Sequence, residues 1–302
     1  MRPYGTPTPS KRPWRRFCFI FFTTNYQLPT NTGGLFVQEI NGKLVIIGGA
    51  EDKEGSCLIL RKFLDLAGGE EARVIILTAA TEAPDEVGAM YQKVFTKLGC
   101  KKVEVLDVPD RTASNSEKVK QMIAYATGVF FTGGDQLRIT SALGGTALLS
   151  ALEKARHRGL VVAGTSAGAS VMSSTMITEG DSDESPKLNT VKMSPGIGLL
   201  SGIVIDQHFA QRGRIGRLLT ALAQNPAVLG LGIDEDTAVI IDEDELLVWG
   251  SQTVTILDGR GVTHTNASLL EPNQYLALTH VTTHILPHGY RFNLSKREPL
   301  LP

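Results

Sequence analysis

Residues 160–168 have the sequence LVVAGTSAG, in which a short apolar run leads into a serine flanked by small residues. An apolar run that ends at glycine is typical of a strand buried on both faces. Residues 164–168 match the G-x-S-x-G pattern of a nucleophile elbow, where a tight turn exposes the serine hydroxyl at the carboxyl end of a strand. Ser166 is therefore a candidate nucleophile, although a tight turn that merely contains serine fits the same five residues.

Similar runs recur before this motif and alternate with segments of helical periodicity. This alternation predicts an α/β fold with a mostly parallel, doubly wound sheet and helices on both faces. After Gly230 the short strand-like runs predict antiparallel additions at one edge of the sheet. A helix is expected at 51–67, and residues 178–196, which lack periodicity, are expected to form a long surface loop. Strands are expected at 44–47, 73–78, 102–106, 128–132, 160–163 and 203–205.

The first 40 residues differ from the rest of the chain. Pro3, Pro7, Pro9 and Pro13 interrupt any regular element, and a basic patch precedes the short apolar run 17–22. This is the order of a signal peptide, but the apolar run is short and no small-residue cleavage site follows at once. We predict a flexible N-terminal extension at 1–40 and a single α/β domain at 41–302. The predicted location is the cytoplasm, with secretion as the alternative because of this extension.

The composition argues against several classes of protein. Of the 302 residues, 42% are hydrophobic, which is enough apolar material for a folded core. The 30 basic and 31 acidic residues give a net charge of −1, so no positive excess is available to bind nucleic acid. Three scattered cysteines fit neither a disulfide scaffold nor a zinc site, and no apolar run reaches the roughly 18 residues that span a membrane. We expect no nucleic-acid or membrane partner and no cofactor.

A nucleophilic serine requires a general base, and the chain has six histidines. His208 directly follows the strand expected at 203–205, and sites in parallel sheets are built at the carboxyl ends of strands. It is the candidate base, with a hydrogen-bonded structural histidine as the alternative. The acid that orients it is expected among Asp234, Glu235 and Asp236, and the residues alone do not distinguish these neighbours.

Three histidines near the C-terminus, His280, His284 and His288, are spaced by four residues, which on a helix would align them for metal binding. The β-branched residues around them favour a strand instead, and Pro287 prevents a helix from continuing. No metal site is predicted.

Groups that stabilise developing negative charge are expected at the same sheet edge. The amide of Ala167 is one candidate oxyanion donor, and that of Gly134, after the neighbouring strand, is the other. Arg212, Arg214 and Arg217 follow the candidate base at the start of a predicted helix, where the helix dipole disfavours cations. Their presence there indicates a use, such as bidentate binding of substrate carboxylates.

Four ordered segments closely resemble the cyanophycinase family, a branch of the serine peptidases related to aspartyl dipeptidase (peptidase E). The resemblance covers roughly residues 42–294. The segments are FTGGDQ at 131–136, GTSAGA at 164–169, DQHF at 206–209 with the three arginines that follow, and GIDEDTA at 232–238. The resemblance implies a class I glutamine-amidotransferase-like α/β fold. The N-terminal extension departs from the family pattern.

The resemblance also implies an activity. Cyanophycin is a poly-aspartate backbone with arginine joined to each side-chain carboxyl. The family cleaves that backbone with a serine, histidine and glutamate triad, releasing β-aspartyl-arginine. The triad maps onto Ser166, His208 and Glu235. The family's substrate-contacting positions map onto Gln136, Asp206, Gln207, Arg212, Arg214 and Arg217. A homodimer is expected, because the family commonly forms dimers.

Two other functions fit parts of the sequence. A peptidase E-like dipeptidase would act on short aspartyl peptides, but the arginines and the DQH context at 206–208 favour the polymer-degrading branch. A phosphate- or nucleotide-binding module would use the glycine pairs at 48–49 or 133–134. No G-x-G-x-x-G follows the first expected strand, however, and no Walker lysine is present.

Overall fold

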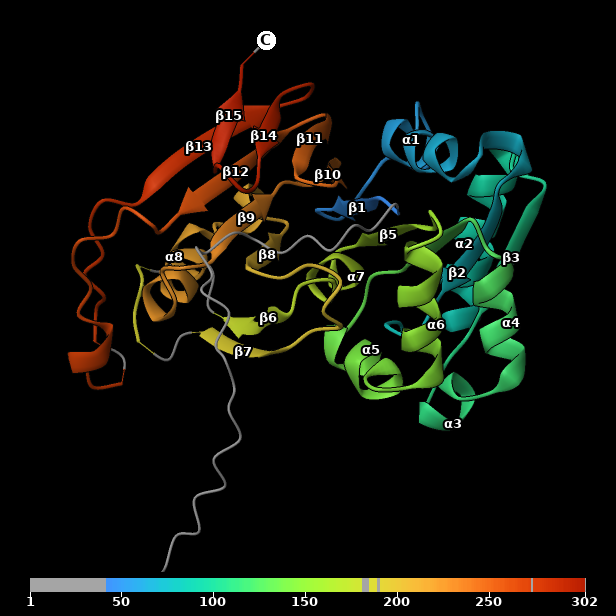
Figure 1. The fold of residues 1–302 in the computed structure, drawn as a ribbon, viewed down its shortest axis with the longest axis horizontal. Coiled ribbons are helices and arrows are strands. Elements are labelled where there is room, and N and C mark those ends of the chain that lie inside the picture. The colour runs from blue at the N-terminus through green and yellow to red at the C-terminus, as the bar shows by residue number, and fades with distance from the viewer. Residues whose placement is uncertain (1–41, 181–184, 189–190, 273, 302) are drawn as a thin grey trace, which may run out of the picture. The chain divides into compact units, whose positions relative to one another are not determined.

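Two β-sheets and a β-hairpin form the framework of the protein in its computed structural model (Figure 1). The structure describes residues 42–180, 185–188, 191–272 and 274–301, which all belong to one compact unit of the chain. The extension predicted at 1–40 lies outside the described residues.

The larger sheet has nine strands. Their bounds are β1 (Leu44–Ile47), β2 (Arg73–Leu77), β3 (Lys102–Leu106), β4 (Gly128–Phe131), β5 (Val161–Thr165), β10 (Thr237–Asp242), β11 (Glu245–Gly250), β14 (Arg291–Asn293) and β15 (Glu298–Leu300). They lie in the order β15-β14-β11-β10-β1-β5-β4-β2-β3. The strands from β1 to β3 in this order are parallel, and those from β10 to β15 pair antiparallel. The predicted mostly parallel sheet with antiparallel additions is confirmed.

Helices cover both faces of the parallel strands. Successive side chains of a strand point to opposite faces, and here the side chains on both faces are apolar. Leu44 and Ile46 of β1 belong to one hydrophobic core, and Val45 and Ile47 belong to another on the opposite face. Helices α1 and α2 pack on the second core and helices α4, α5 and α6 on the first (Figure 1). The bounds are α1 (Leu58–Ala67), α2 (Pro84–Lys97), α3 (Arg111–Ser114), α4 (Glu117–Tyr125), α5 (Gln136–Leu143), α6 (Ala147–Arg156) and α7 (Ala167–Ser170).

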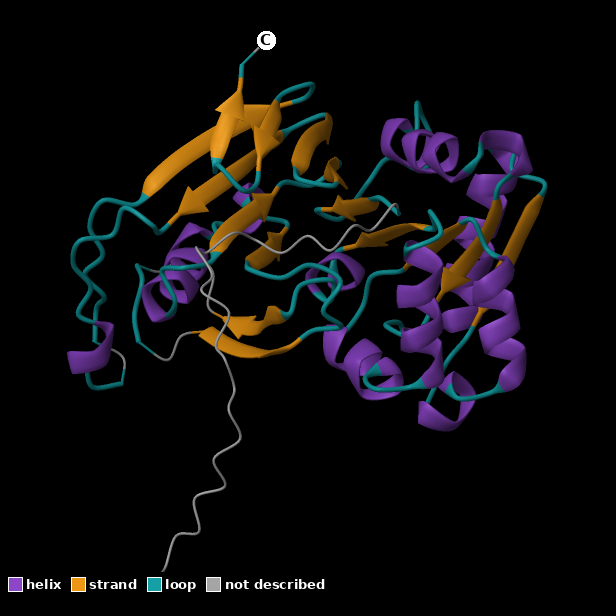
Figure 2. Ribbon diagram, in the orientation of Figure 1, coloured by secondary structure: helices purple, strands orange, loops and turns teal. Residues whose placement is uncertain are grey.

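A second sheet of four strands lies beside the first, and few helices lie next to it (Figure 2). Its strands are β8 (Ile203–Gln207), β9 (Leu229–Ile233), β12 (Thr253–Asp258) and β13 (Thr282–Pro287), in the order β13-β12-β9-β8. Helix α8 (Ile215–Gln224) packs on one face through Leu218 and Leu222. The other face, including Ile205 and Leu231, joins the core of the nine-stranded sheet. The C-terminal strands are thus divided between two sheets.

The prediction of a surface loop at 178–196 is partly wrong. Strands β6 (Thr175–Gly180) and β7 (Val191–Pro195) pair as an antiparallel hairpin. The pairing shifts register between Ile177 and Glu179, so the alternation of apolar and polar residues that identifies a strand is interrupted.

The helix predicted from residue 51 begins only at Leu58. The Asp52 carboxylate accepts hydrogen bonds from the amides of Gly55, at 2.8 Å, and Cys57, at 2.9 Å. An aspartate that binds nearby amides in this way stabilises a turn in place of the first helical turns.

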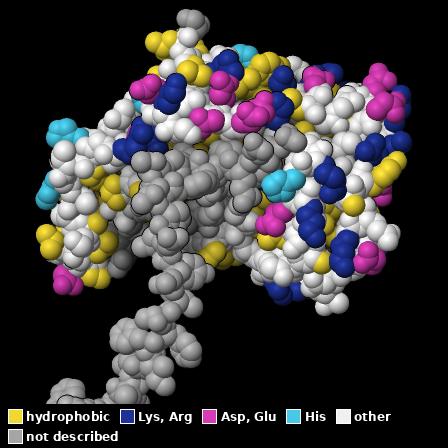
Figure 3. All heavy atoms as spheres, viewed as in Figure 1, with side chains coloured by type: hydrophobic (Ala, Val, Ile, Leu, Met, Phe, Trp, Pro, Cys, Tyr) yellow, Lys and Arg dark blue, Asp and Glu magenta, His cyan; other side chains and the backbone are white. Residues whose placement is uncertain are grey.

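The described surface carries charges of both signs. Figure 3 shows basic and acidic side chains interspersed on the visible face, in line with the net charge of −1. Within the described ranges, no helix combines the length and apolarity that crossing a membrane requires.

Candidate active site

Ser166 lies in the turn between β5 and α7. Its backbone has φ 54° and ψ −112°, a conformation that residues with a side chain rarely adopt. The flanking glycines allow the chain to pack closely there: a Cβ on Gly164 would lie 2.3 Å from the Gly168 carbonyl oxygen. The Ser166 amide donates to the Ile47 carbonyl at 3.1 Å, which fixes the turn against the end of β1. Local sequence and one neighbouring strand therefore determine the place of the serine.

His208 directly follows β8 and brings its ring to Ser166. The distance between His208 Nε2 and Ser166 Oγ is 2.9 Å. The His208 amide donates to the Gly48 carbonyl at 2.8 Å, with His208 at a positive φ of 48°. A Cβ on Gly49 would lie 2.3 Å from a ring carbon of His208, so only glycine leaves room for the imidazole at this place.

Glu235 is the third residue of this series of side-chain contacts. Its Oε1 lies 2.6 Å from His208 Nδ1. The two neighbouring acids point elsewhere: Asp234 accepts a hydrogen bond from the hydroxyl of the first residue of β12, and Asp236 accepts one from the Asp52 amide. Of the three candidates that the residues left open, Glu235 is the one placed to orient the imidazole.

The surroundings of His208 favour its neutral form. Burial lowers the pKa of the imidazole, the hydrogen bond to Glu235 opposes this effect, and the positive charges of Arg212 and Arg214 lower the pKa further. The net pKa lies below the ordinary value of histidine. A ring that is neutral at neutral pH can accept the Ser166 proton.

Both segments predicted to supply oxyanion donors lie next to Ser166. A Cβ on Gly133 would be 3.4 Å from the Ser166 Cβ, so the turn after β4 packs against Ser166. Gly134 has a φ of 143°, and a Cβ there would lie 2.1 Å from a backbone oxygen of Ala80. Ala167 opens α7, where amides have no acceptor within the helix. Because α7 spans only four residues, local amides matter more here than a helix dipole.

A buried ion pair lies beside the histidine. Asp206 is fully buried and accepts from Arg217 through both oxygens, with Nε to Oδ2 at 2.7 Å. Arg214 donates to the backbone oxygen of Gln207 at 2.5 Å and to its side-chain oxygen. Arg214 and Arg217 are each 7% exposed, whereas Arg212 is exposed to solvent. Two buried guanidinium groups, those of Arg214 and Arg217, face the single carboxylate of Asp206, so this part of the site carries net positive charge.

The structure thus shows Asp206 and Gln207, both predicted to contact substrate, holding the arginines in place. Gln136, also predicted to contact substrate, opens α5 after β4. Its amide nitrogen donates to the carbonyls of Ile177 and Thr178 in β6, each at 3.1 Å. That contact ties the hairpin to the end of β4.

Comparison with known proteins places this arrangement in a family. Residues 44–249 match peptidase family S51, and this range contains Ser166, His208 and Glu235. The chain belongs to peptidase family S51. It is therefore a hydrolase of the serine-peptidase type.

Relatives of this S51 peptidase cover most of its length. A protein named cyanophycinase from Nostoc sp. is 41% identical over 259 residues, covering 85% of this chain and 87% of that protein. Another from Geminocystis herdmanii is 40% identical over 265 residues, covering 87% of this chain and 97% of that protein. A solved peptidase from an acI-B1 actinobacterium has a TM-score of 0.58 at 19% identity, covering 82% of this chain and 98% of that chain. The last likeness shows the fold, which is the predicted glutamine-amidotransferase-like class.

Sequence analysis of this S51 peptidase missed the loop that follows β1. Gly48 and Gly49 contact the histidine, and the Gly49 carbonyl accepts from the Asp236 amide at 2.9 Å. A glycine pair at the carboxyl end of the strand next to β5 is a usable signal for such a contact. The sequence pattern alone suggests only a phosphate-binding role for this glycine pair.

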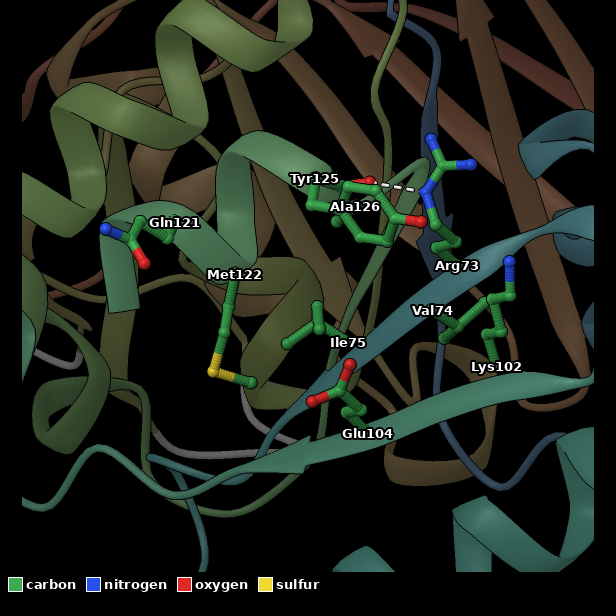
Figure 4. Close-up of a pocket in the computed structure, with 9 residues that line it drawn as sticks. All are labelled: Arg73, Val74, Ile75, Lys102, Glu104, Gln121, Met122, Tyr125 and Ala126. Carbon is green, nitrogen blue, oxygen red and sulfur yellow. Dashed lines mark hydrogen bonds between the residues drawn. The ribbon is translucent and has the colours of Figure 1, made fainter. Parts of the chain in front are cut away.

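Other predicted or possible sites lie apart from this one. His284 is part of β13 and His288 follows it, and no group of three or more metal-binding side chains occurs within the described ranges. A pocket of about 270 Å³ opens at the amino ends of β2 and β3, opposite to the end that carries Ser166 (Figure 4). It is lined by Arg73, Val74, Ile75, Lys102, Glu104, Gln121, Met122, Tyr125 and Ala126.

Proposed function

We propose that this S51 peptidase is a cyanophycinase, which hydrolyses the poly-aspartate backbone of cyanophycin and releases β-aspartyl-arginine dipeptides. The observation that carries this proposal is the identity of about 40% to proteins named cyanophycinase over most of the chain. The unbroken contact from Ser166 through His208 to Glu235 supports it independently.

In the proposed reaction, Ser166 Oγ attacks the backbone carbonyl carbon of an aspartyl residue while its proton moves to His208 Nε2. Glu235 holds the ring orientation and stabilises the imidazolium that forms. The amides of Gly134 and Ala167 are the proposed donors to the tetrahedral oxyanion. His208 then returns the proton to the departing amine. Water then attacks the acyl carbon and gives a proton to His208. His208 passes this proton to Ser166 Oγ as the bond between that oxygen and the acyl group breaks.

The net positive charge beside His208 supports a substrate rich in carboxylates. Each arginine of cyanophycin is joined through its amino group, so it retains a free α-carboxylate. We propose that Arg212, Arg214 and Arg217 contribute to binding such carboxylates, with Gln136, Asp206 and Gln207 completing the subsite. Asp206 and Gln207 support this role through the arginines that they hold.

The test uses a suspension of insoluble cyanophycin. The purified protein should clear the turbidity and release soluble product with the mass of β-aspartyl-arginine. Ser166→Ala should keep the fold and lose about 10³-fold or more in rate. The loss is not complete, because the oxyanion donors and substrate binding still support a residual rate. Near-normal clearing by that variant would contradict the assignment of the nucleophile.

A peptidase E-like dipeptidase is the alternative. If a folded preparation leaves the polymer intact but hydrolyses short aspartyl dipeptides, the alternative replaces the proposal.

We further propose that the enzyme acts in the cytoplasm as a homodimer, on the basis of the family resemblance. Light scattering of the full-length protein tests the assembly, and fractionation of the producing cells tests the location.

A further inference from the structure

Glu51 is a buried carboxylate that takes no part in the Ser166–His208–Glu235 chain. It lies in the loop after β1 and is 3% exposed. Burying a charged group costs free energy unless hydrogen bonds or an opposite charge compensate. Glu51 has both: Oε2 accepts from the Thr165 hydroxyl at 2.5 Å, and Oε1 accepts from the Tyr91 hydroxyl at 2.5 Å. Lys53 Nζ lies 3.0 Å from Oε1.

The partners of Glu51 are themselves fixed. Burial, together with the negative charge of Glu51, raises the pKa of Tyr91 well above its ordinary value, so the phenol stays a neutral donor. Its ring packs on Phe130 of β4, with centroids 4.7 Å apart. Thr165 is 3% exposed and is the last residue of β5. Glu51 therefore joins the loop after β1 to the end of β5 directly and, through Tyr91 of α2, to the core beside β4.

The end of β1 and this loop contact Ser166, His208 and the residue next to Glu235 through backbone carbonyls. The Ile47 carbonyl, at its start, accepts from the Ser166 amide at 3.1 Å. The Gly48 carbonyl accepts from His208, and the Gly49 carbonyl accepts from Asp236, the neighbour of Glu235. Two residues later Glu51 binds Thr165, the residue that precedes the nucleophile.

We propose that Glu51 is a positioning residue for the reaction: through Thr165 it holds the loop after β1 in register with the elbow, and so keeps Ser166 and His208 at reacting distance. The proposal rests on the triad of the proposed function. Misplacement of reacting groups by about 1 Å can reduce a rate by about 10²-fold, so a hydrogen bond without substrate contact can still matter for turnover.

Thr165→Val is the discriminating variant, because it removes the hydroxyl but keeps nearly the same shape and leaves Glu51 paired with Tyr91 and Lys53. Thr165→Ser restores a hydroxyl at the same place. Thr146→Val is the matched control: Thr146 is also buried, and its hydroxyl donates to the Leu143 carbonyl at 2.7 Å, away from the site.

The readout is the rate at which a fluorophosphonate labels Ser166, measured by mass spectrometry on samples whose fold is checked by thermal unfolding. In this reaction Ser166 Oγ attacks phosphorus, the P–F bond breaks, fluoride leaves with the bonding electrons, and the hydroxyl proton passes to His208. Labelling needs the nucleophile and base but not the natural substrate. The same variants are then assayed for kcat and KM on cyanophycin.

We expect Thr165→Val to slow labelling and kcat by about fivefold or more with KM little changed, and Thr165→Ser and Thr146→Val to stay near the parent rate. A smaller loss in Thr165→Val overturns the role of Glu51 while leaving the proposed function in place. Absence of Ser166 labelling in the parent protein overturns the proposed function itself, and the positioning role with it.

Glu51→Gln adds a coupling test. If Glu51 acts through Thr165, the double variant should be no slower than Glu51→Gln alone, whereas losses that multiply would contradict the link. Should Thr165→Val fail to fold, Tyr91→Phe removes the other hydroxyl donor and keeps the aromatic packing. It is expected to slow labelling in the same direction, and an unchanged rate counts against the proposal.

Discussion

The nine-stranded and four-stranded sheets position the candidate active site by different means. In the larger sheet, Ser166 is held by a tight turn of small residues and by one backbone hydrogen bond to β1. In the smaller sheet, His208 and Glu235 follow β8 and β9, the two parallel neighbours of an otherwise antiparallel sheet. Figure 2 shows helices gathered around the first sheet and few beside the second.

The difference lies in what fixes each group. The serine is placed mainly by the turn of small residues around it, with one backbone hydrogen bond to β1. The histidine depends on more groups from distant segments: the Gly48 carbonyl, the glycine at 49 and the Glu235 carboxylate. Neither sheet forms the site alone. The carboxyl ends of β1 and β5 meet those of β8 and β9, and the loop after β1 joins the two groups of strands.

The largest effect is expected from removing the charge that the smaller sheet supplies. Glu235→Gln keeps the side-chain size but removes the carboxylate 2.6 Å from His208 Nδ1. The imidazole then loses the group that fixes its tautomer and stabilises its protonated form. We expect kcat to fall by about 10³- to 10⁴-fold, measured as the rate at which the polymer suspension clears.

Glu245→Gln is the matched control, because Glu245 lies on β11 of the nine-stranded sheet and its side chain is partly exposed, paired with Arg291. It should change kcat less than twofold, since surface ion pairs contribute about 0–1 kcal/mol to stability and this one is far from the reacting atoms. A loss below tenfold in Glu235→Gln would show that the base is oriented by another group.

The same contrast explains what the sequence predicts well. The strand at 44–47 and the elbow at 164–168 depend on local patterns, namely apolar runs that end in glycine, and the structure has β1 and β5 there. Where a side chain rearranges the backbone locally, prediction failed: Asp52 delays the start of α1 to Leu58. The register shift in β6 similarly concealed a hairpin in a segment predicted as loop.

The site was predictable to the extent that strand ends reveal it. His208 was identified from its place after a strand, although that strand belongs to a second sheet that the pattern did not separate from the first. Glu235 could not be distinguished from its neighbours by spacing; only the family resemblance selected it. Glu51 gave no local signal, because Tyr91 and Thr165 are 40 and 114 residues away in the chain.

An intermediate effect is expected at the loop between the two sheets. In Gly49→Ala, the new methyl group would lie 2.3 Å from a carbon of the His208 ring, so the ring must leave the position that it holds between Ser166 and Glu235. The backbone strain at a φ of 101° adds to the cost. We expect kcat to fall by about 10- to 100-fold, with a smaller rate of Ser166 labelling by a fluorophosphonate.

Gly69→Ala separates strain from displacement. Gly69 also has a positive φ, of 63°, but nothing lies within 4 Å of the position of its Cβ. It should lower stability by about 1–2 kcal/mol in chemical unfolding and leave kcat unchanged. If the two variants lose activity equally, strain in the fold, not displacement of the ring, accounts for the loss.

The smallest effect concerns the charge around the base, and its sign follows from the causes of the His208 pKa. Burial lowers this pKa and the Arg212 charge lowers it further, against the opposing effect of Glu235. The base is active only when unprotonated, so kcat/KM should rise with pH through the His208 pKa, below the ordinary range of histidine, and level off near neutrality. Arg212→Gln removes a charge that disfavours the imidazolium. The pKa should rise, and the acid limb of the pH profile should move to higher pH.

The position of that limb, and not its height, is the decisive quantity. Arg212 is also a proposed carboxylate-binding residue, so the variant is expected to lose affinity at every pH, but a loss of binding alone lowers the profile without moving it. Arg73→Gln is the control, because Arg73 starts β2 at the end of the sheet opposite to Ser166. It should leave the limb in place. If the acid limb of the kcat/KM profile also keeps its pH position in Arg212→Gln, the titrating group is not His208. The base would then have to be sought outside the smaller sheet.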